Sequence, residues 1–338
     1  MRTEYYHDTS EEIAFAAALL RNGELVAFPT ETVYGLGADA RREESVRAVF
    51  AAKGRPADNP LIVHIAEIGQ LYEIASEVPD IALRLAKAFW PGPLTMVLPK
   101  QDCIPEVTSG GLDTVGIRMP SHPTARALIK ESGCPIAAPS ANRSGKPSPT
   151  TAKHVMDDME GRISAVLDGG QCSVGVESTV ICFDDAETIH ILRPGLISRE
   201  DLAPFAANVY VDPAVFSQVA ADARVSSPGM KYKHYAPNAR ILPVDAPDFR
   251  TFSDYVSKHA VYGTYCLLFD ADPEIPGIPS LRYGDNGAQQ AHDLFLRFRE
   301  LDEAGAKLVY VRMPRQDGAA LSVYNRLMRA AGFEAVRL

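Results

Sequence analysis

Polar loops adjoin short apolar runs at three separate places in this sequence, and this pairing constrains the fold more than any other feature. Leu25–Phe28 leads into the loop Pro29–Gly37, and Ile136–Pro139 leads into Ser140–Ser148. A third loop, Lys53–His64, joins a run with helical periodicity to a further apolar strand. Open α/β sheets bind ligands at the ends of their strands, so the pattern predicts an α/β fold in which three loops share one cleft.

The charges in these loops suit an anionic ligand, although a simpler interpretation stays open. Arg55 offers a planar fork that fits phosphate or carboxylate, and Lys53 offers a compact point charge. Two basic residues in one turn are equally compatible with a solvated surface. The glycine-containing loop Pro29–Gly37 lacks the GxxxxGK[ST] pattern of a Walker loop, so phosphate binding here requires a different arrangement.

Arg118 stands in an otherwise apolar predicted strand, Thr114–Met119. One explanation is a solvated arginine on an edge strand. The other is a buried arginine, which needs an anionic partner from a neighbouring loop or from a bound ligand. The sequence alone leaves both open.

Length and composition limit the classes of protein to which this sequence can belong. A chain of 338 residues is too long for most single cores, so two domains are expected. The net charge of -9 and the sequence pI near 5.4 argue against bulk attachment to nucleic acid or to an anionic membrane, but not against a local basic cleft. Five dispersed cysteines without a CxxC pair, and an N-terminus unlike a signal peptide, predict a cytoplasmic protein with reduced thiols and no zinc site.

The chain divides into a first domain over 1–206, a connector over 207–240 and a second domain over 241–338. In the second domain, apolar strands alternate with helical patterns, which predicts a small Rossmann-like parallel sheet. The expected strands are Ile241–Val244, Cys266–Phe269 and Leu308–Val311, and the expected helices are Phe249–Lys258, Ala288–Ala304 and Ala319–Ala331. No GxGxxG follows the first strand, which argues against a dinucleotide role, and a regulatory or stabilising cap is expected.

The connector contains apolar and aromatic residues where a passive linker would be polar or rich in Gly and Ser. Met230, Tyr232 and Tyr235 interrupt it, and Gly229 and Pro237 punctuate it. Such side chains favour docking onto another surface, and we expect this segment to act as a lid. Helix starts are predicted at Thr9 with Glu12, at Thr150 and at Ser198.

Taken together, the motifs of the first 205 residues resemble those of the YrdC-like family. Their order and spacing match the family: PTETVYGLG, KGRPADNPLIVHI, WPGPLT, GIRMP, APSANRSG and ESTV. The later run SPGMKYKHYAP, at Ser227–Pro237, resembles the linker of the long form, which carries an added C-terminal domain. The resemblance implies a curved mixed α/β sheet with a positive concave face.

The resemblance also implies a nucleotidyltransferase reaction. L-Threonine, bicarbonate and ATP would give threonylcarbamoyl-adenylate and pyrophosphate, with Mg²⁺ bridging the phosphates. The product would pass to a tRNA threonylcarbamoyl transferase complex that modifies adenosine 37. Protein residues would supply no metal ligands, and no organic cofactor is implied.

Residue roles follow from the resemblance, position by position. Four residues would form the phosphate-binding, catalytic set: Lys53, Arg55, Ser140 and Asn142. ATP would be bound by Arg55, Asn59, Thr114, Ser140, Ser148 and Arg193, with Tyr235 closing over the nucleotide. Threonine would be bound by Thr32, His64, Arg118, Thr179 and the backbone of Ala138.

These residue types agree with the implied chemistry. Phosphoryl chemistry asks mainly for positioning and charge stabilisation, and the motifs contain cations, hydroxyls and amides without an evident covalent nucleophile. His64 is a candidate general base, but a binding role is favoured, because an attacking carboxylate needs no deprotonation at neutral pH. Two other functions are less favoured. An RNA-binding module with the same fold is disfavoured by the net acidity and by the lack of interleaved aromatic and basic residues. A carbamoyl-transfer domain of the hydrogenase-maturation type would come with acylphosphatase and zinc-finger modules, and this sequence shows neither.

Overall fold

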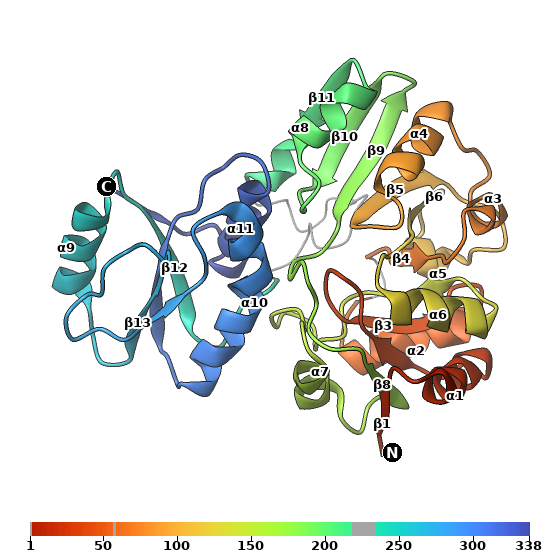
Figure 1. Cartoon of the computed structure of the whole chain (residues 1–338), viewed down its shortest axis with the longest axis horizontal. Helices are drawn as coiled ribbons and strands as arrows, with labels where there is room; N and C mark the ends of the chain where they lie inside the picture. Colours follow the sequence, from red (N-terminus) through yellow and green to blue (C-terminus); the bar gives the residue numbers. More distant parts are fainter. Residues whose placement is uncertain (1, 57–58, 218–233) are drawn as a thin grey trace.

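The computed structural model describes residues 2–56, 59–217 and 234–338 of the chain, which form two α/β parts (Figure 1). The first part is built on a mixed sheet of eleven described strands, and the second on a parallel sheet of five. Both predicted fold classes are confirmed. Tyr232 and most of the predicted lid lie outside the described residues.

The first sheet takes its strands from most of the N-terminal two thirds of the chain. Its strands are β1 (Glu4–His7), β2 (Val26–Phe28), β3 (Gly35–Asp39), β4 (Ile62–His64), β5 (Leu94–Pro99), β6 (Thr114–Arg118), β7 (Ile136–Ala137), β8 (Ala165–Asp168), β9 (Thr179–Asp185), β10 (Thr188–Arg193) and β11 (Asn208–Val211). Its helices are α1 (Ser10–Arg21), α2 (Glu43–Lys53), α3 (Gly69–Ile74), α4 (Asp80–Phe89), α5 (Glu106–Ser109), α6 (Pro123–Ser132), α7 (Ala152–Met159) and α8 (Arg199–Leu202), with short 3₁₀ turns at Ala203–Phe205 and Pro213–Val215.

The strand order brings the polar loops of distant segments together. The order is β1-β8-β2-β3-β7-β4-β6-β5-β9-β10-β11, so β3, β7, β4 and β6 are neighbours at the centre. β4 and β6 run parallel with His64 opposite Arg118, and β7 pairs antiparallel to β4 with Ile136 opposite His64. Because β7 runs antiparallel to β4, the loop after β7 lies beside the start of β4 and beside the end of the loop Pro29–Gly37, where Ser140 bridges to Gly35. The three predicted loops therefore meet at one end of the central strands, while His64 and Arg118 end β4 and β6 at the other.

Helices cover the outer side of this sheet and bury an extensive core (Figure 1). Helix α1 packs on α6, and its buried positions Ile13, Ala16, Ala17 and Leu20 recur at helical spacing. Thr9 caps α1 by accepting from the backbone N–H of Glu12, as predicted, but the predicted capping box is incomplete, because the Glu12 carboxylate accepts from the backbone N–H of His7. Ser198 caps α8 as predicted, in a full capping box with Asp201. The cap of α7 is Thr151, one residue after the predicted Thr150.

The second sheet is parallel in the order β14-β13-β15-β12-β16. Its strands are β12 (Arg240–Asp245), β13 (Thr264–Leu268), β14 (Ser280–Arg282), β15 (Leu308–Arg312) and β16 (Val336–Arg337), and its helices are α9 (Phe249–His259), α10 (Gly287–Glu303) and α11 (Ala320–Ala330). The three predicted strands and three predicted helices are present with small shifts at their ends. The short β14 and β16 were not predicted.

The two parts share one hydrophobic cluster. Val33, Val174 and Val176 of the first part lie in the same cluster as Tyr235 and Phe295. The two backbones also approach closely, since a Cβ on Gly175 would lie 2.4 Å from the carbonyl oxygen of His292 in α10. A glycine is therefore required at this crossing, where φ is also positive. Strand β11 pairs with β10, so the first sheet continues to Val211, inside the segment assigned to the connector.

None of the described helices has both the length and the apolar character needed to cross a membrane.

Candidate active site

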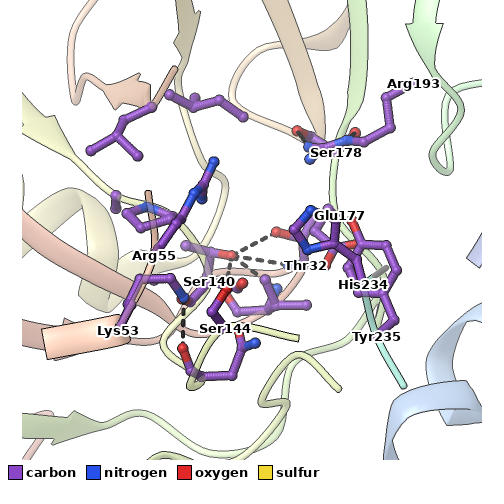
Figure 2. Close-up of a pocket in the computed structure, with 18 of the residues that line it drawn as sticks. Thr32, Lys53, Arg55, Ser140, Ser144, Glu177, Ser178, Arg193, His234 and Tyr235 are labelled. Carbon is purple, nitrogen blue, oxygen red and sulfur yellow. Dashed lines mark hydrogen bonds between the residues drawn. The ribbon is translucent and has the colours of Figure 1, made fainter. Parts of the chain in front are cut away.

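A cavity lies where the central strand ends of the first sheet meet the second part (Figure 2). Its wall combines cations, hydroxyls and amides from the three predicted loops. Ten of the fourteen predicted site residues line it: Thr32, Lys53, Arg55, His64, Arg118, Ala138, Ser140, Asn142, Arg193 and Tyr235. Among the described residues of the wall, the charged groups are five cations and one carboxylate: Lys53, Arg55, Arg118, Lys146 and Arg193, and Glu177.

The loop after β2 arranges its hydroxyls with local hydrogen bonds. The Thr30 hydroxyl donates to the carbonyl oxygen of Val33 at 2.6 Å, accepts from the backbone N–H of Thr32 at 3.1 Å, and lies 2.8 Å from the Thr32 hydroxyl. Such a side-chain turn holds the loop in a fixed shape. Thr32 is thereby aimed at Arg118, whose Nη1 donates to its hydroxyl at 2.9 Å.

Arg118 is buried, which excludes the solvated-edge explanation. It ends β6 inside the sheet with 3% of its surface exposed, and its Nη2 lies 2.7 Å from Glu31 Oε1. Its Nε also donates to the carbonyl oxygen of Gly92 at 3.3 Å. A buried guanidinium held on several sides is pre-oriented for a carboxylate ligand. Glu31, which the sequence did not single out, is its anionic protein partner.

Lys53 ends α2 and points into the loop after β7. Its Nζ donates to the carbonyl oxygen of Asn142 at 2.6 Å and to that of Ser140. Burial lowers the pKa of Lys53 well below its ordinary value, and the charge of Arg55 lowers it further. Lys53 therefore holds the 140–142 backbone in position as well as lining the cavity.

Two asparagines present polar atoms without a partner among the described residues. Asn59 is completely buried, and neither its Nδ2 nor its Oδ1 is hydrogen-bonded. Asn142 donates to the carbonyl oxygens of Arg143 and Lys146, but its Oδ1 has no hydrogen-bond partner. Leaving a buried amide unpaired costs free energy, so both side chains favour a polar ligand that would satisfy them.

Arg193, the last residue of β10, lies on the opposite wall, close to Ser178 (Figure 2). Its Nε and Nη2 donate to the carbonyl oxygen and the hydroxyl of Ser178, both at 3.1 Å. Burial lowers the pKa of Arg193 to about 10, and the nearby charges of Arg326 and Arg118 act in the same direction. Arg193 stays protonated at neutral pH, and an anion among these crowded cations would relieve their repulsion.

His64 is a neutral, weakly basic side chain here. Burial and the charge of Arg118 lower the pKa of His64 to about 3. Its Nδ1 lies 3.3 Å from the carbonyl oxygen of Ile136, which can only accept, so the proton of the neutral ring sits on Nδ1 and Nε2 carries a lone pair. A group with so low a pKa is a poor general base at neutral pH, which favours the binding role.

The described end of the connector reaches the cavity. Tyr235 is 6% exposed, and its ring centre lies 5.3 Å from that of Phe295 in α10. The next residue, Ala236, donates its backbone N–H to the carbonyl oxygen of Gly145 at 2.9 Å. Burial, and then the charge of Arg55, lower the pKa of His234 to about 3. The residues after 233 therefore form part of the cavity wall.

Four predicted site residues lie beside the cavity wall without forming it. Asn59 precedes the lining residue Pro60, and Thr179 follows Ser178 while donating to the carbonyl oxygen of Ile197. Thr114 shares a face of β6 with Arg118 by the alternation of a strand. Ser148 donates to the lining carboxylate of Glu177. Sequence reasoning gave no role to Glu31 or Glu177, because their arginine partners are distant in the chain.

The fold and this cavity define a class of protein: a two-domain α/β protein with a cationic ligand site at the strand ends of a mixed sheet, bordered on one side by His234 and Tyr235 of the connector. Comparison with known proteins makes the class specific. The Sua5/YciO/YrdC family model, described as "Telomere recombination", matches residues 18–195. The model described as "Threonylcarbamoyl-AMP synthase, C-terminal domain" matches residues 197–332.

Curated relatives match over the full length. The threonylcarbamoyl-AMP synthase of Pyrococcus abyssi is 44% identical, with 97% of this chain and 96% of the relative covered. That of Bacillus subtilis is 43% identical, covering 99% and 97%. The chain therefore belongs to the Sua5/YciO/YrdC family, in its two-domain threonylcarbamoyl-AMP synthase branch, and it is an enzyme. The relative from Pseudomonas aeruginosa PAO1 is 35% identical over only 179 residues, which make up 95% of that protein.

A solved structure shares both domains and their arrangement. P. abyssi Sua5 complexed with L-threonine superposes with a TM-score of 0.92 at 42% identity and covers the whole of both chains. A variant of the same protein, H234A/Y235A, gives a TM-score of 0.92 at 41% identity.

Proposed function

We propose that this enzyme joins L-threonine, bicarbonate and ATP to form threonylcarbamoyl-AMP and pyrophosphate, which makes it a nucleotidyltransferase. Its product would serve the N6-threonylcarbamoylation of adenosine 37 in tRNA in the cytoplasm, through a downstream transferase complex. The observation that carries the proposal is a cavity in which buried arginines from separate strand ends face hydroxyls and the unpaired amide oxygen of Asn142. Such a wall suits several negative charges and one small polar ligand.

The polyphosphate would bind where the loops of α2 and β7 meet. Arg55 offers its fork and Ser140 its hydroxyl as donors to phosphate oxygens. The unpaired amide oxygen of Asn142 can only accept, so it suits a donor group of the ligand. Lys53 supplies positive potential and keeps the Ser140–Asn142 backbone in place through its two carbonyl contacts. Fixed donors of this kind need little rearrangement as charge moves onto the departing pyrophosphate.

Magnesium would enter with ATP as part of that substrate. The two carboxylates at the site, Glu31 and Glu177, are each engaged by an arginine. Elsewhere in the described ranges, no cluster of three or more His, Cys, Asp or Glu side chains could hold a metal ion. We therefore assign the ion to the phosphates of the nucleotide and not to protein ligands.

The amino acid would bind at the Arg118 end of the cavity. The Arg118 guanidinium suits the threonine carboxylate, and the hydroxyls of Thr32 and Thr179 with the Ala138 backbone suit its polar groups. The Nε2 lone pair of His64 can accept one hydrogen from the ligand. The P. abyssi protein, which is similar along its whole length, is described as complexed with L-threonine.

The reaction needs no protein nucleophile. The amino group of threonine and bicarbonate would combine to a carbamate with loss of water, and a carbamate oxygen would attack the α-phosphorus of ATP. The bond from the α-phosphorus to the bridging oxygen then breaks, and pyrophosphate leaves with the electron pair. The residues of the cavity align the two anions and offset their repulsion.

Pyrophosphate release tests this function directly. Release should require threonine, bicarbonate and ATP together, and omission of any one should reduce it to background. Serine lacks the methyl group and valine lacks the hydroxyl, so both should react poorly, valine more so. Release that is independent of threonine would overturn the proposal.

An RNA-binding module is the second candidate, and the exposure of the cations counts against it. Arg118 and Arg193 are 3% and 7% exposed, so they cannot form the open basic surface that nucleic acid requires. A basic cavity of this kind fits a small anionic ligand better.

A further inference from the structure

Helix α11 of the C-terminal domain is buried along its whole length and lies on the side that faces the catalytic domain (Figure 1). Several of its buried side chains are polar, and buried polar groups need partners. Two find partners in the catalytic part: Asn325 donates to the carbonyl oxygen of Val215 at 2.7 Å, and Arg329 donates to that of Ala214 at 3.1 Å. Another polar side chain of α11, Arg326, reaches Glu177 in the wall of the active-site cavity.

Arg326 is completely buried and makes a hydrogen-bonded ion pair across the domain boundary. Its Nε donates to Oε2 of Glu177 at 2.8 Å, and its Nη1 donates to Asn325 at 3.0 Å. Its guanidinium carbon lies 5.5 Å from the ring centre of Tyr235, within the range of a cation–π interaction. One side chain of the C-terminal domain thus contacts both the wall of the cavity and the described end of the connector.

Glu177 links Arg326 to Ser148, a residue assigned to the nucleotide. Its second oxygen, Oε1, accepts a hydrogen bond from the hydroxyl of Ser148 at 2.5 Å. Burial by itself would raise the pKa of Glu177, but the charges of Arg326 and Arg193 and the bond from Ser148 hold it below its ordinary value. An ionised carboxylate can only accept hydrogen bonds, so the Ser148 hydroxyl must donate its proton to Glu177. Ser148 can therefore offer only lone pairs to a ligand.

We propose that Arg326 is a positioning residue of the nucleotide site, which fixes the Ser148 hydroxyl through Glu177 and holds Tyr235 against the cavity. The inference rests on the proposed function, because it takes Ser148 and Tyr235 as contacts of ATP, the roles that the family resemblance implies for them. It gives the C-terminal domain a direct part in the active site, beyond that of a stabilising cap. The single-domain relative of 179 matched residues has no room for such a domain, so the arrangement is particular to the two-domain branch.

The test compares steady-state kinetics of pyrophosphate release in the full-length enzyme and four variants. Arg326→Met removes the charge at similar length, Arg326→Lys keeps the charge but loses the planar fork, and Glu177→Gln removes the acceptor charge. The fourth variant combines Arg326→Met with Glu177→Gln. We expect Arg326→Met to raise KM for ATP about tenfold or more, with kcat and KM for threonine changed less than about threefold.

Two features separate positioning from general support of the fold. Arg326→Lys should recover part of the loss, because an ammonium can still pair with the carboxylate. The double variant should be no worse than the poorer single variant, because both changes break the same contact. If Arg326→Met leaves too little folded protein, the double variant, which buries no unpaired charge, carries the measurement against Glu177→Gln alone.

Arg299 provides a matched control. It also forms a buried ion pair across the domain boundary, from α10 to Asp158 of α7 at 2.9 Å, and it donates to the carbonyl oxygen of Pro147. None of these three residues lines the cavity. Arg299→Met should therefore lower the melting temperature while leaving KM for ATP within about twofold.

The outcomes are distinguishable. If folded Arg326→Met has a KM for ATP within about twofold of the wild type, or if Arg299→Met shifts this KM equally, the positioning role is wrong. If the wild-type enzyme itself releases no pyrophosphate with all three substrates, the proposed function fails instead. Additive effects of Arg326→Met and Glu177→Gln on KM for ATP would likewise overturn the route through Glu177.

Discussion

Two arginines, one in each domain, end a strand and pair with a carboxylate, but only the one in the first domain lines a ligand cavity. Arg118 is the last residue of β6 and Arg312 the last residue of β15, and each ion-pairs with a carboxylate, Glu31 at 2.7 Å and Asp272 at 3.2 Å. Around Arg118 the neighbouring loops leave a cavity lined with hydroxyls and amides. Around Arg312 three aromatic rings fill the space, with centres 5.2 to 5.9 Å from the guanidinium carbon: Phe249, Phe252 and Phe269.

The difference shows that a strand end becomes a site only where the surrounding loops leave space and polar groups. Both sheets are α/β and both offer a fixed cation at a strand end, so the fold alone does not distinguish them. What distinguishes them is the chemistry of the loops, polar at Pro29–Gly37 and aromatic beside Arg312. Arg118 is therefore expected to matter for activity and Arg312 for stability.

Replacing Arg118 should have the largest effect. If Arg118 binds the threonine carboxylate as proposed, Arg118→Met would remove two charge-assisted hydrogen bonds, each contributing about 1.5–3 kcal/mol. The value of kcat/KM for threonine should fall at least about a hundredfold, with circular dichroism close to that of the wild type. A variant that retains a third of the wild-type kcat/KM would remove Arg118 from the threonine site.

Arg55 tests the phosphate end of the same cavity. Arg55→Ala should lower kcat/KM for ATP roughly ten- to a hundredfold, because one charged fork toward the phosphates is lost. Pyrophosphate release at varied ATP and saturating threonine measures it. A loss below twofold would show that Arg55 does not contact the nucleotide in the transition state.

Arg312 should show the opposite pattern. Arg312→Met leaves Asp272 without its partner and removes the stacking on the aromatic rings, which should cost about 2 kcal/mol in the free energy of unfolding. Urea denaturation of the full chain measures this cost, and kcat/KM at 25 °C should stay within about twofold of the wild type. A tenfold loss of activity in a folded variant would contradict the assignment of this strand end to structure alone.

Local sequence patterns predict much of the fold and of the site. The alternation of apolar runs with polar loops predicted the mixed and the parallel sheet, and the motifs predicted ten residues of the cavity wall. Strands β14 and β16 escaped prediction because three and two residues carry no readable periodicity. The predicted cap of α7, Thr150, is one residue before the observed cap, Thr151. Both threonines are suitable caps, and only the backbone geometry selects between them.

The parts that could not be predicted are contacts between distant segments. Glu31 and Glu177 gain their importance from Arg118 and Arg326, and the second of these pairs spans 149 residues and two domains. No local pattern marks Arg326, because it sits in an amphipathic helix whose apolar face explains the sequence equally well. Long-range pairs of this kind depend on how the two domains dock.

The smallest expected effect concerns the protonation of His64, which should make the free energy of unfolding depend on pH. Its pKa is lowered to about 3 in the folded enzyme, against an ordinary value of 6.5, so the unfolded chain binds one more proton below pH 6.5. The stability that His64 contributes is full above that pH and is lost as the pH falls from 6.5 toward 3.

Between pH 6.5 and 5.5 the free energy of unfolding of the wild type should therefore fall by about 1 kcal/mol more than that of His64→Gln. The other buried histidines, His154 and His234, titrate in both proteins and cancel, so urea denaturation curves at the two pH values isolate His64. Equal losses in the two proteins would mean that the imidazole is not held neutral beside Arg118, and the binding role argued from its low basicity would lose its support.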